Sequence, residues 1–150
     1  MTIELIKRML DACYQAKRIR DLLPPLPEGV TSSYIQYLDV IQTLNKQGIQ
    51  AKVSDISDIL SLPRPGVTRT VKEMESKGYL TKTASQKDGR VTYLSITDSG
   101  KQLSEKYNEQ YFHALVPFME DISEADAKCM IDTIEKFYQI MCERRISLDR

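Results

Sequence analysis

Cysteine and histidine are both scarce in this sequence. The 150 residues contain three cysteines and one histidine, and the cysteines stand far apart, at positions 13, 129 and 142. An odd number of widely spaced cysteines indicates neither a disulfide framework nor a thiolate zinc site. The single His113 argues against a histidine-rich metal site. The sequence therefore predicts no metal ligands and no cofactor.

Long apolar runs are also missing. No run approaches the roughly 20 residues that a bilayer crossing needs, and the first eight residues lack the apolar segment of a signal peptide. With 41% hydrophobic and 28% charged residues, the composition is that of an ordinary soluble globular protein. We expect a cytoplasmic protein without membrane contact.

The net charge is zero at pH 7, but it is unevenly distributed. Residues 63–90 carry seven cationic and three anionic side chains, a net charge of +4, whereas residues 101–150 carry seven cationic and ten anionic ones, a net charge of −3. A cationic surface attracts polyanions and binds them less tightly as salt rises. The central segment is therefore a candidate binding surface for nucleic acid.

Most of the chain shows apolar residues at three- and four-residue steps, a pattern typical of amphipathic helices. Helices are predicted over about residues 3–23, 31–48, 53–60, 65–77, 100–119 and 124–145. Two β-prone stretches, 81–83 and 91–96, flank a turn signal at Asp88-Gly89 and predict a hairpin. The predicted fold is mainly α with a small β-hairpin wing.

Residues 53–100 have the order of a winged helix-turn-helix: a short helix, a turn, a second helix and the hairpin. In the second helix, Val67, Val71 and Met74 fall on one face, and Arg69 lies on the opposite side because each residue advances the helix by about 100°. Pro65 is expected at the first helical position, where a missing amide hydrogen costs nothing.

These residues resemble the multiple antibiotic resistance regulator (MarR) family of bacterial transcription factors. The resemblance rests on the order and spacing of the short helix and of four further motifs: Arg64–Arg69, Glu75–Leu80, Lys87–Val91 and Leu94–Gly100. It implies one domain over 1–150, with a DNA-binding winged helix-turn-helix at 31–100 and dimerisation helices at 1–30 and 101–150. The long amphipathic helices at both ends independently favour burial against a second copy.

The resemblance implies a transcriptional regulator, expected to be a repressor, that binds a palindromic double-stranded DNA operator as a homodimer. A small-molecule or stress signal would release it. Arg69 is the first choice for a base contact, because its guanidinium can bond both acceptors of guanine. Arg90 would enter the minor groove. The complete predicted DNA-binding set is Arg64, Pro65, Thr68, Arg69, Lys72, Lys87, Asp88 and Arg90.

Two residues depart from the family pattern at the start of the second helix. Pro63 stands where the family has a capping Ser or Thr, so another group must cap the helix or its first turn is strained. Gly66 lowers the helix propensity of that turn by up to about 1 kcal/mol relative to Ala. Both departures could change which bases are read.

The resemblance also implies a pocket for a small aromatic or anionic effector. Its predicted lining is Met9, Cys13, Arg20, Tyr34 and Tyr37, although both tyrosines fit a dimer core equally well. A related branch senses organic peroxides through a cysteine of the first helix, which makes Cys13 a candidate for thiol-based oxidant sensing. Cys13 falls on the apolar stripe of its helix, and simple packing is the competing interpretation.

Two other classes of function compete with DNA binding. A winged-helix protein-interaction module would hold a protein partner and would not bind DNA in a salt-dependent manner. An enzyme would need a nucleophile with its base, metal-ligand spacing or a phosphate-binding glycine loop, and the sequence offers none of these. We therefore predict no catalytic residues.

Overall fold

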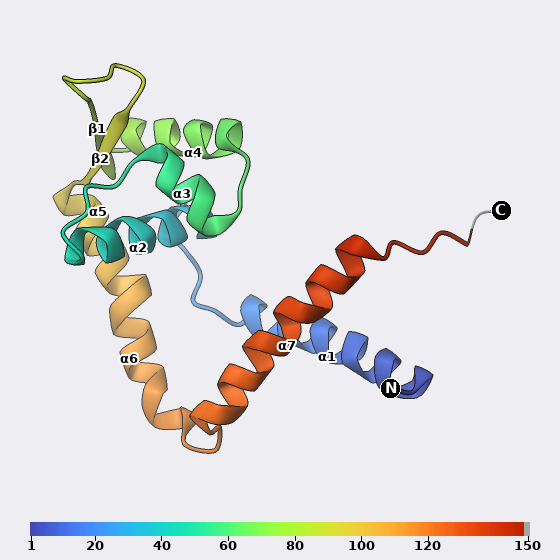
Figure 1. The fold of residues 1–150 in the computed structure, drawn as a ribbon. Helices are drawn as coiled ribbons and strands as arrows, with labels where there is room; N and C mark the ends of the chain where they lie inside the picture. The colour runs from blue at the N-terminus through green and yellow to red at the C-terminus, as the bar shows by residue number, and fades with distance from the viewer. Residues whose placement is uncertain (149–150) are drawn as a thin grey trace. The chain divides into compact units, whose positions relative to one another are not determined.

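The structure is a computed structural model that describes residues 1–148. In chain order its elements are α1 (Ile3–Asp21), α2 (Ser32–Lys46), α3 (Val53–Leu60), α4 (Arg64–Ser76), β1 (Leu80–Ala84), β2 (Thr92–Ile96), α5 (Asp98–Ser104), the π-helical turn η1 (Glu105–Gln110), α6 (Tyr111–Leu115), the 3-10 turn η2 (Val116–Met119) and α7 (Glu124–Glu143) (Figure 1). The predicted fold class, mainly α with a β-hairpin, is confirmed. The chain divides into two compact units, Met1–Glu109 and the residues from Gln110 onward.

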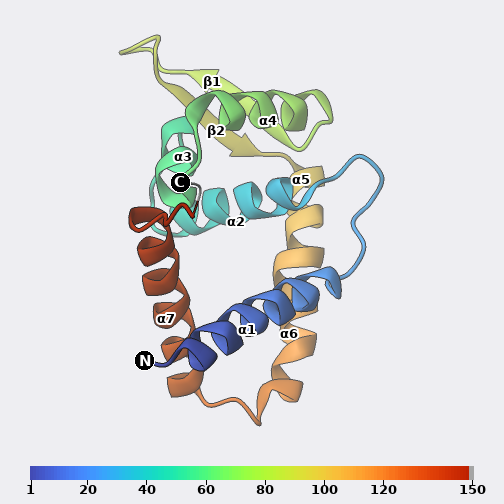
Figure 2. The ribbon, with the colours of Figure 1, turned by 90° about the vertical axis from the view of Figure 1, so that its right-hand side faces the viewer.

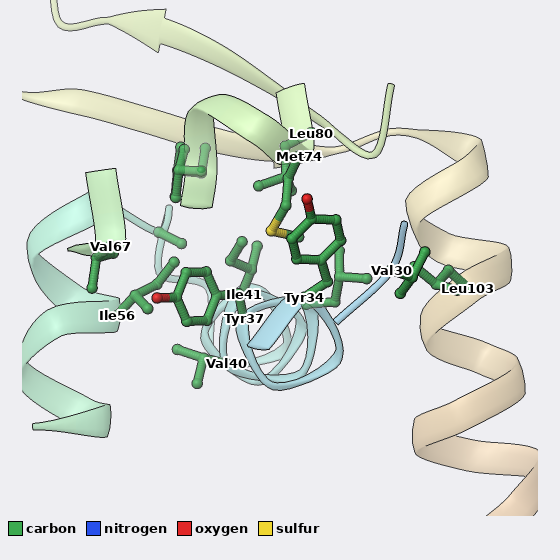
Figure 3. Packing of buried hydrophobic residues seen from close by; sticks show 14 residues of the cluster. Val30, Tyr34, Tyr37, Val40, Ile41, Ile56, Val67, Met74, Leu80 and Leu103 are labelled. Atoms are coloured by element: carbon green, nitrogen blue, oxygen red, sulfur yellow. The ribbon is translucent and has the colours of Figure 1, made fainter. Parts of the chain in front are cut away.

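The hydrophobic core of the first unit is built around α2. Tyr34, Tyr37, Leu38 and Ile41 are spaced by three, one and three residues, so they share one face of this helix, and all four are buried. Figure 3 shows Tyr34, Tyr37 and Ile41 packed among side chains from α3, α4, β1 and α5. The other buried apolar residues of this core are Val30, Val40, Ala51, Ile56, Val67, Val71, Met74, Leu80, Leu94 and Leu103.

The hairpin pairs β1 with β2 in antiparallel register, from Leu80 opposite Ile96 to Ala84 opposite Thr92. Residues 51–52 also pair with β2 of the hairpin. The Leu94 amide donates to the Ala51 carbonyl at 2.9 Å, and Lys52 forms an isolated bridge with Tyr93. The residues just before α3 are thereby fixed to the wing. In both views α4 lies beside the hairpin (Figure 1 and Figure 2).

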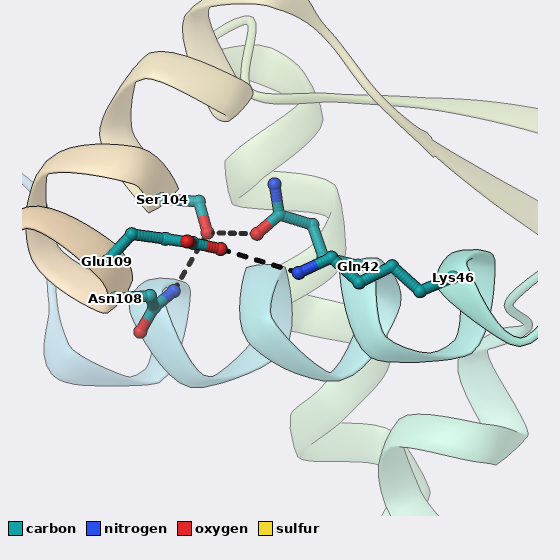
Figure 4. A network of polar contacts seen from close by, with 5 residues as sticks. All are labelled: Gln42, Lys46, Ser104, Asn108 and Glu109. Carbon is teal, nitrogen blue, oxygen red and sulfur yellow. Dashed lines mark hydrogen bonds and ion pairs between the residues drawn. The ribbon is translucent and has the colours of Figure 1, made fainter.

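A polar network joins α2 to the helix that follows the wing (Figure 4). The hydroxyl of the fully buried Ser104 donates to Gln42 Oε1 at 2.6 Å. The Asn108 amide donates to Ser104 Oγ at 2.8 Å and to the Ile35 carbonyl at 3.1 Å. Lys46 and Glu109 form an exposed ion pair at 3.4 Å. Because its buried polar atoms are paired, the hydrogen bonds of the network offset the desolvation cost of burying them.

The prediction of one continuous helix over 100–119 was wrong in detail. The helix begins two residues earlier, at Asp98, passes through the π-helical turn η1, and ends in the 3-10 turn η2. Pro117 lies within η2 and lacks the amide hydrogen that an α-helical ladder would use there. No residue pattern in the sequence signals η1.

The outer helices have well-formed starts and exposed sides. Thr2 Oγ1 accepts from the Leu5 amide at 3.1 Å at the start of α1, and Ser123 Oγ accepts from the Asp126 amide at 3.0 Å at the start of α7. No residue of α1 or α7, both of which are described throughout, is buried. None of the helices within residues 1–148 has the length and hydropathy to cross a membrane.

Candidate nucleic-acid interface

Helix α4 separates a buried face from an exposed cationic one. Val67, Val71 and Met74 are buried, as predicted, whereas Thr68, Arg69 and Lys72 are exposed. The helix ends at Lys77 and Gly78, and the φ of Gly78 is +80°, the left-handed cap expected from its glycine. The apolar face therefore fixes the helix on the core and leaves the cationic face open to a ligand.

The start of α4 differs slightly from the prediction. Pro63 does occupy the N-cap position, where no side chain caps the helix. The first helical residue is Arg64, so Pro65 is the second rather than the first. The Val67 amide donates to the Pro63 carbonyl at 3.2 Å. With no capping side chain, the other free amides of the first turn remain available to solvent or to a bound phosphate.

The tip of the wing is braced by short-range hydrogen bonds. Asp88 Oδ1 accepts from the Arg90 amide at 3.0 Å and lies 3.9 Å from Arg90 Nε. Ser85 Oγ accepts from the amides of Lys87 and Asp88 at 3.2 and 3.3 Å, and Ser85 and Val91 are joined by a backbone bond of 2.9 Å. The Arg90 side chain itself is 95% exposed. The hydrogen-bonded turn thus presents a cationic side chain to the solvent.

A cleft of about 460 Å³ lies between α3, α4 and the wing. Four cationic residues line it: Lys52, Arg64, Lys82 and Arg90. Lys82 Nζ also lies 3.5 Å from Glu75 Oε1, which ties the first strand of the wing to the last turn of α4. Because the four cations come from separate elements that converge here, the cleft concentrates positive charge suited to a polyanion.

The structure groups the eight predicted DNA-binding residues in two sets. Arg64, Thr68 and Arg90 line the cleft. The other five lie outside its lining, on exposed positions of α4 and the wing tip: Pro65, Arg69, Lys72, Lys87 and Asp88.

Sequence reasoning missed four polar residues of the cleft, namely Lys52, Ser54, Lys82 and Thr92. Lys82 belongs to the basic segment, but its direction depends on the strand register that places it opposite Leu94. Lys52 precedes α3 and reaches the cleft through its bridge to Tyr93. The β-prone stretch 81–83 could have suggested Lys82, whereas no local pattern points to Lys52.

The five residues predicted for an effector pocket have different surroundings. Tyr34 and Tyr37 are buried in the core, and the Tyr34 hydroxyl donates to Glu73 Oε2 at 3.2 Å. Met9 is half-buried, and Cys13 and Arg20 are exposed on α1. Both tyrosines are thus buried within a single chain, without a second copy, and the effector pocket stays a prediction.

The three cysteines are free and exposed. In α7 a hydrogen bond with Cys142 raises the pKa of Tyr138 above its usual value. Within residues 1–148, no three Cys, His, Asp or Glu side chains gather in a way that could hold a metal ion.

The winged helix-turn-helix region is similar to a known protein family. The sequence profile of the MarR family matches residues 28–91. The chain is 23% identical over 108 residues to the uncharacterised HTH-type transcriptional regulator YdgJ of Bacillus subtilis, covering 72% of this chain and 63% of that protein. It is 33% identical over 95 residues to the HTH-type transcriptional repressor MdtR of the same organism, covering 63% and 59%. The chain thus spans less than two thirds of the length of both relatives.

The fold is also shared with solved structures. FabT of Streptococcus pneumoniae, crystallised in complex with DNA, superposes with a TM-score of 0.66 at 19% identity, covering 95% of this chain and 99% of that one. At this identity the likeness shows the fold, while the family profile matches residues 28–91, which contain α2, α3, α4 and β1. Residues 28–91 of this chain thus match the MarR family, and α3, α4 and the hairpin have the geometry of a winged helix-turn-helix.

Proposed function

We propose that this protein binds double-stranded DNA as a homodimer and represses transcription by occupying an operator. The observation that carries the proposal is the convergence of four cations from α3, α4 and the wing on one cleft, beside the exposed cationic face of α4. The repressor role is supported by the likeness to MdtR, which is named as a repressor. The FabT structure in complex with DNA supports the use of this fold on a duplex.

The exposed residues divide into two roles on DNA. Arg69 stands in the middle of the open face of α4 and would read a guanine in the major groove, since its five donors fit both acceptors of that base. Arg64, Lys52 and Lys82 face the cleft and would hold phosphates, which set the register without reading sequence. Arg90, braced by Asp88, would reach into the minor groove.

A homodimer is supported by the exposed apolar residues of the outer helices. In α7, Met130, Ile131, Ile134, Tyr138 and Met141 are exposed, although their spacing places them on one face. A second copy would bury this face, and its two-fold symmetry would call for a palindromic operator with half-sites about 34–36 Å apart. A signal molecule would release DNA by favouring a dimer whose α4 helices no longer fit successive grooves.

Operator binding tests the proposal directly. A duplex selected from a random library should bind the wild-type protein, and Arg69→Ala should weaken that binding by about tenfold to a hundredfold. Arg90→Ala should also weaken it and should lower the salt slope by about one unit. Lys101→Ala removes an exposed charge from α5 and serves as the matched control. Unchanged affinity in both arginine variants would refute the assigned contacts.

The same measurement separates the competing functions. A protein-interaction module would show little salt-dependent affinity for any duplex. For the oxidant-sensing alternative, peroxide should release DNA from the wild-type protein and fail to release it from Cys13→Ser. An equal response of the two proteins would remove Cys13 from the mechanism.

A further inference from the structure

The C-terminal end of α4 is tied to the chain segment that arrives from α1. The Lys77 ammonium donates a hydrogen bond to the Gly29 carbonyl at 2.5 Å, and the same nitrogen lies 5.2 Å from the centroid of the Tyr34 ring. Gly29 has a φ of +76°, a conformation that glycine adopts without strain. One cation therefore joins the connection between α1 and α2 to the end of the helix that carries Arg69.

A second tie lies one turn earlier on the same side of α4. The hydroxyl of Tyr34, which is buried, donates to Glu73 Oε2 at 3.2 Å. The Tyr34 ring also meets Tyr79 edge-on, with centroids 6.1 Å apart. Glu73 and Lys77 are four residues apart, so they neighbour each other on the helix surface. The two contacts thus join the end of α4 to Gly29, just before α2, and to Tyr34, in the first turn of α2.

The C-terminal end of α4 is also bonded to the segment that leads into α5. Thr97 Oγ1 donates to the Gly78 carbonyl at 2.5 Å, and the Thr97 amide donates to the Tyr79 carbonyl at 3.2 Å. Gly100 packs so closely that a Cβ there would lie 2.3 Å from the Tyr79 carbonyl oxygen. The end of α4 is therefore fixed from both connecting segments, and Lys77 supplies the contact to the one that comes from α1.

We propose that Lys77 is a positioning residue for DNA recognition. Its bond to Gly29 fixes the C-terminal end of α4 and, with it, the direction in which Arg69 is presented. This inference rests on the proposed DNA-binding function. A base contact requires closely defined geometry, whereas phosphate contacts with non-specific DNA tolerate a small rotation of the helix. Loss of the tie should therefore weaken operator binding more than non-specific binding.

Lys77 is itself an exposed cation, so a direct phosphate contact is the competing role. The two roles differ in their dependence on salt. A lost phosphate contact lowers the salt slope by about one unit, whereas a lost positioning contact leaves the slope unchanged. Lys72, an exposed cation of α4 in the predicted DNA-binding set, would contact a phosphate and provides the matched comparison.

The binding experiment compares Lys77→Met with Lys72→Met on the selected operator and on an unrelated duplex, each at several salt concentrations. Methionine keeps an unbranched chain and removes the donor. For Lys77→Met we expect operator affinity to fall about tenfold, which is a smaller loss than removing all base contacts would cause. The affinity for the unrelated duplex and the salt slope should stay unchanged. Lys72→Met should lower both affinities and the slope. Unchanged operator affinity, or a slope loss equal to that of Lys72→Met, would overturn the proposal.

Amide hydrogen exchange tests the tie without DNA. In Lys77→Met, exchange should accelerate both in the segment containing the Val30 amide, which is bonded to Pro27, and in residues 73–79. Lys72→Met should leave exchange in both segments at the wild-type rate, since it removes an exposed cation of α4 and keeps the bond between Lys77 and Gly29. Wild-type exchange rates in Lys77→Met would show that this bond does not hold the end of α4.

The binding and exchange experiments distinguish a failure of the proposed function from a failure of the role of Lys77. If the wild-type protein binds no duplex, the proposed function is wrong, and the exchange measurement still decides whether Lys77 holds α4. If Lys77→Met does not fold, Tyr34→Phe removes the bond to Glu73 and keeps the buried ring, and it should show the same selective loss of operator affinity. Equal loss on both duplexes in that variant would overturn the positioning role.

Discussion

The winged module, residues 30–103, and the outermost helices, α1 and α7, treat their apolar residues in opposite ways. The core of the first unit consists of module residues only, from Val30 to Leu103. Both outer helices carry apolar residues at helical spacing and bury none of them within the described chain. The module can therefore close its own core, whereas the outer helices have apolar faces that only a further surface could cover. Folding and assembly thus depend on different parts of the sequence.

The largest effect on folding is expected inside the module. Leu38 is fully buried at the centre of α2, so Leu38→Ala should lower the free energy of unfolding by about 2–5 kcal/mol through lost burial and a residual cavity. Denaturant unfolding followed by circular dichroism, at one fixed protomer concentration, measures it. Ile59→Ala on the exposed side of α3 is the control and should cost about 0.5 kcal/mol or less. Similar losses in both variants would contradict a closed module core.

The next effect concerns assembly. Ile131 lies on the apolar face of α7 and is 56% exposed. Ile131→Asp would place a charge at this face in each copy, and should raise the dimer dissociation constant by at least about a hundredfold, or about 2.8 kcal/mol. Sedimentation equilibrium measures it, with Lys136→Asp on the opposite side of α7 as the control. A wild-type protein that is monomeric, or a dimer that tolerates Ile131→Asp, would break the comparison between the two regions.

A smaller effect compares one helix cap from each region. Thr97 Oγ1 accepts from the Gly100 amide at 3.1 Å and also donates to the Gly78 carbonyl, whereas Ser123 Oγ caps α7 with a bond to the Asp126 amide. Ser123 Oγ also donates to Asp126 Oδ2 at 2.8 Å, and both of its bonds are exposed, whereas the bond from the Gly100 amide to Thr97 is partly buried. Ser123→Ala should therefore cost about 1 kcal/mol and Thr97→Val about 2 kcal/mol, since a bond shielded from water is costlier to lose. Thermal unfolding at a fixed protomer concentration checks the order. If Ser123→Ala cost more than Thr97→Val, the stability of the C-terminal end of α4 would not depend on the Thr97 bonds.

The elements of the module were predictable because each depends on a few adjacent residues. The short helix over 53–60 was predicted at its observed bounds, and the alternation of Val67, Val71 and Met74 identified the buried face of α4. Gly78 marked the end of that helix, and Asp88-Gly89 marked the turn of the hairpin. In each case periodicity or turn chemistry acts over one or two helical turns, a range that a single sequence displays directly.

The candidate site was predicted only in part, since a cleft depends on which elements meet. The open face of α4 and the basic wing followed from the sequence, but the approach of Lys52 and Lys82 to Arg64 did not. Lys52 reaches the cleft because its backbone pairs with Tyr93, 41 positions further along the chain. Such a pairing leaves no local pattern.

Local patterns in the chain were enough to predict the order of the helices, the winged hairpin, the two faces of α4 and the resemblance to the MarR family. Three features became visible only in the folded chain: Tyr34 is buried with its hydroxyl on Glu73, Lys77 donates to the carbonyl of Gly29, and the helix after the wing contains a π-helical turn. The difference lies in the range of the interactions. Local elements follow from the periodicity of neighbouring side chains, whereas these contacts depend on which residues the shared core brings together.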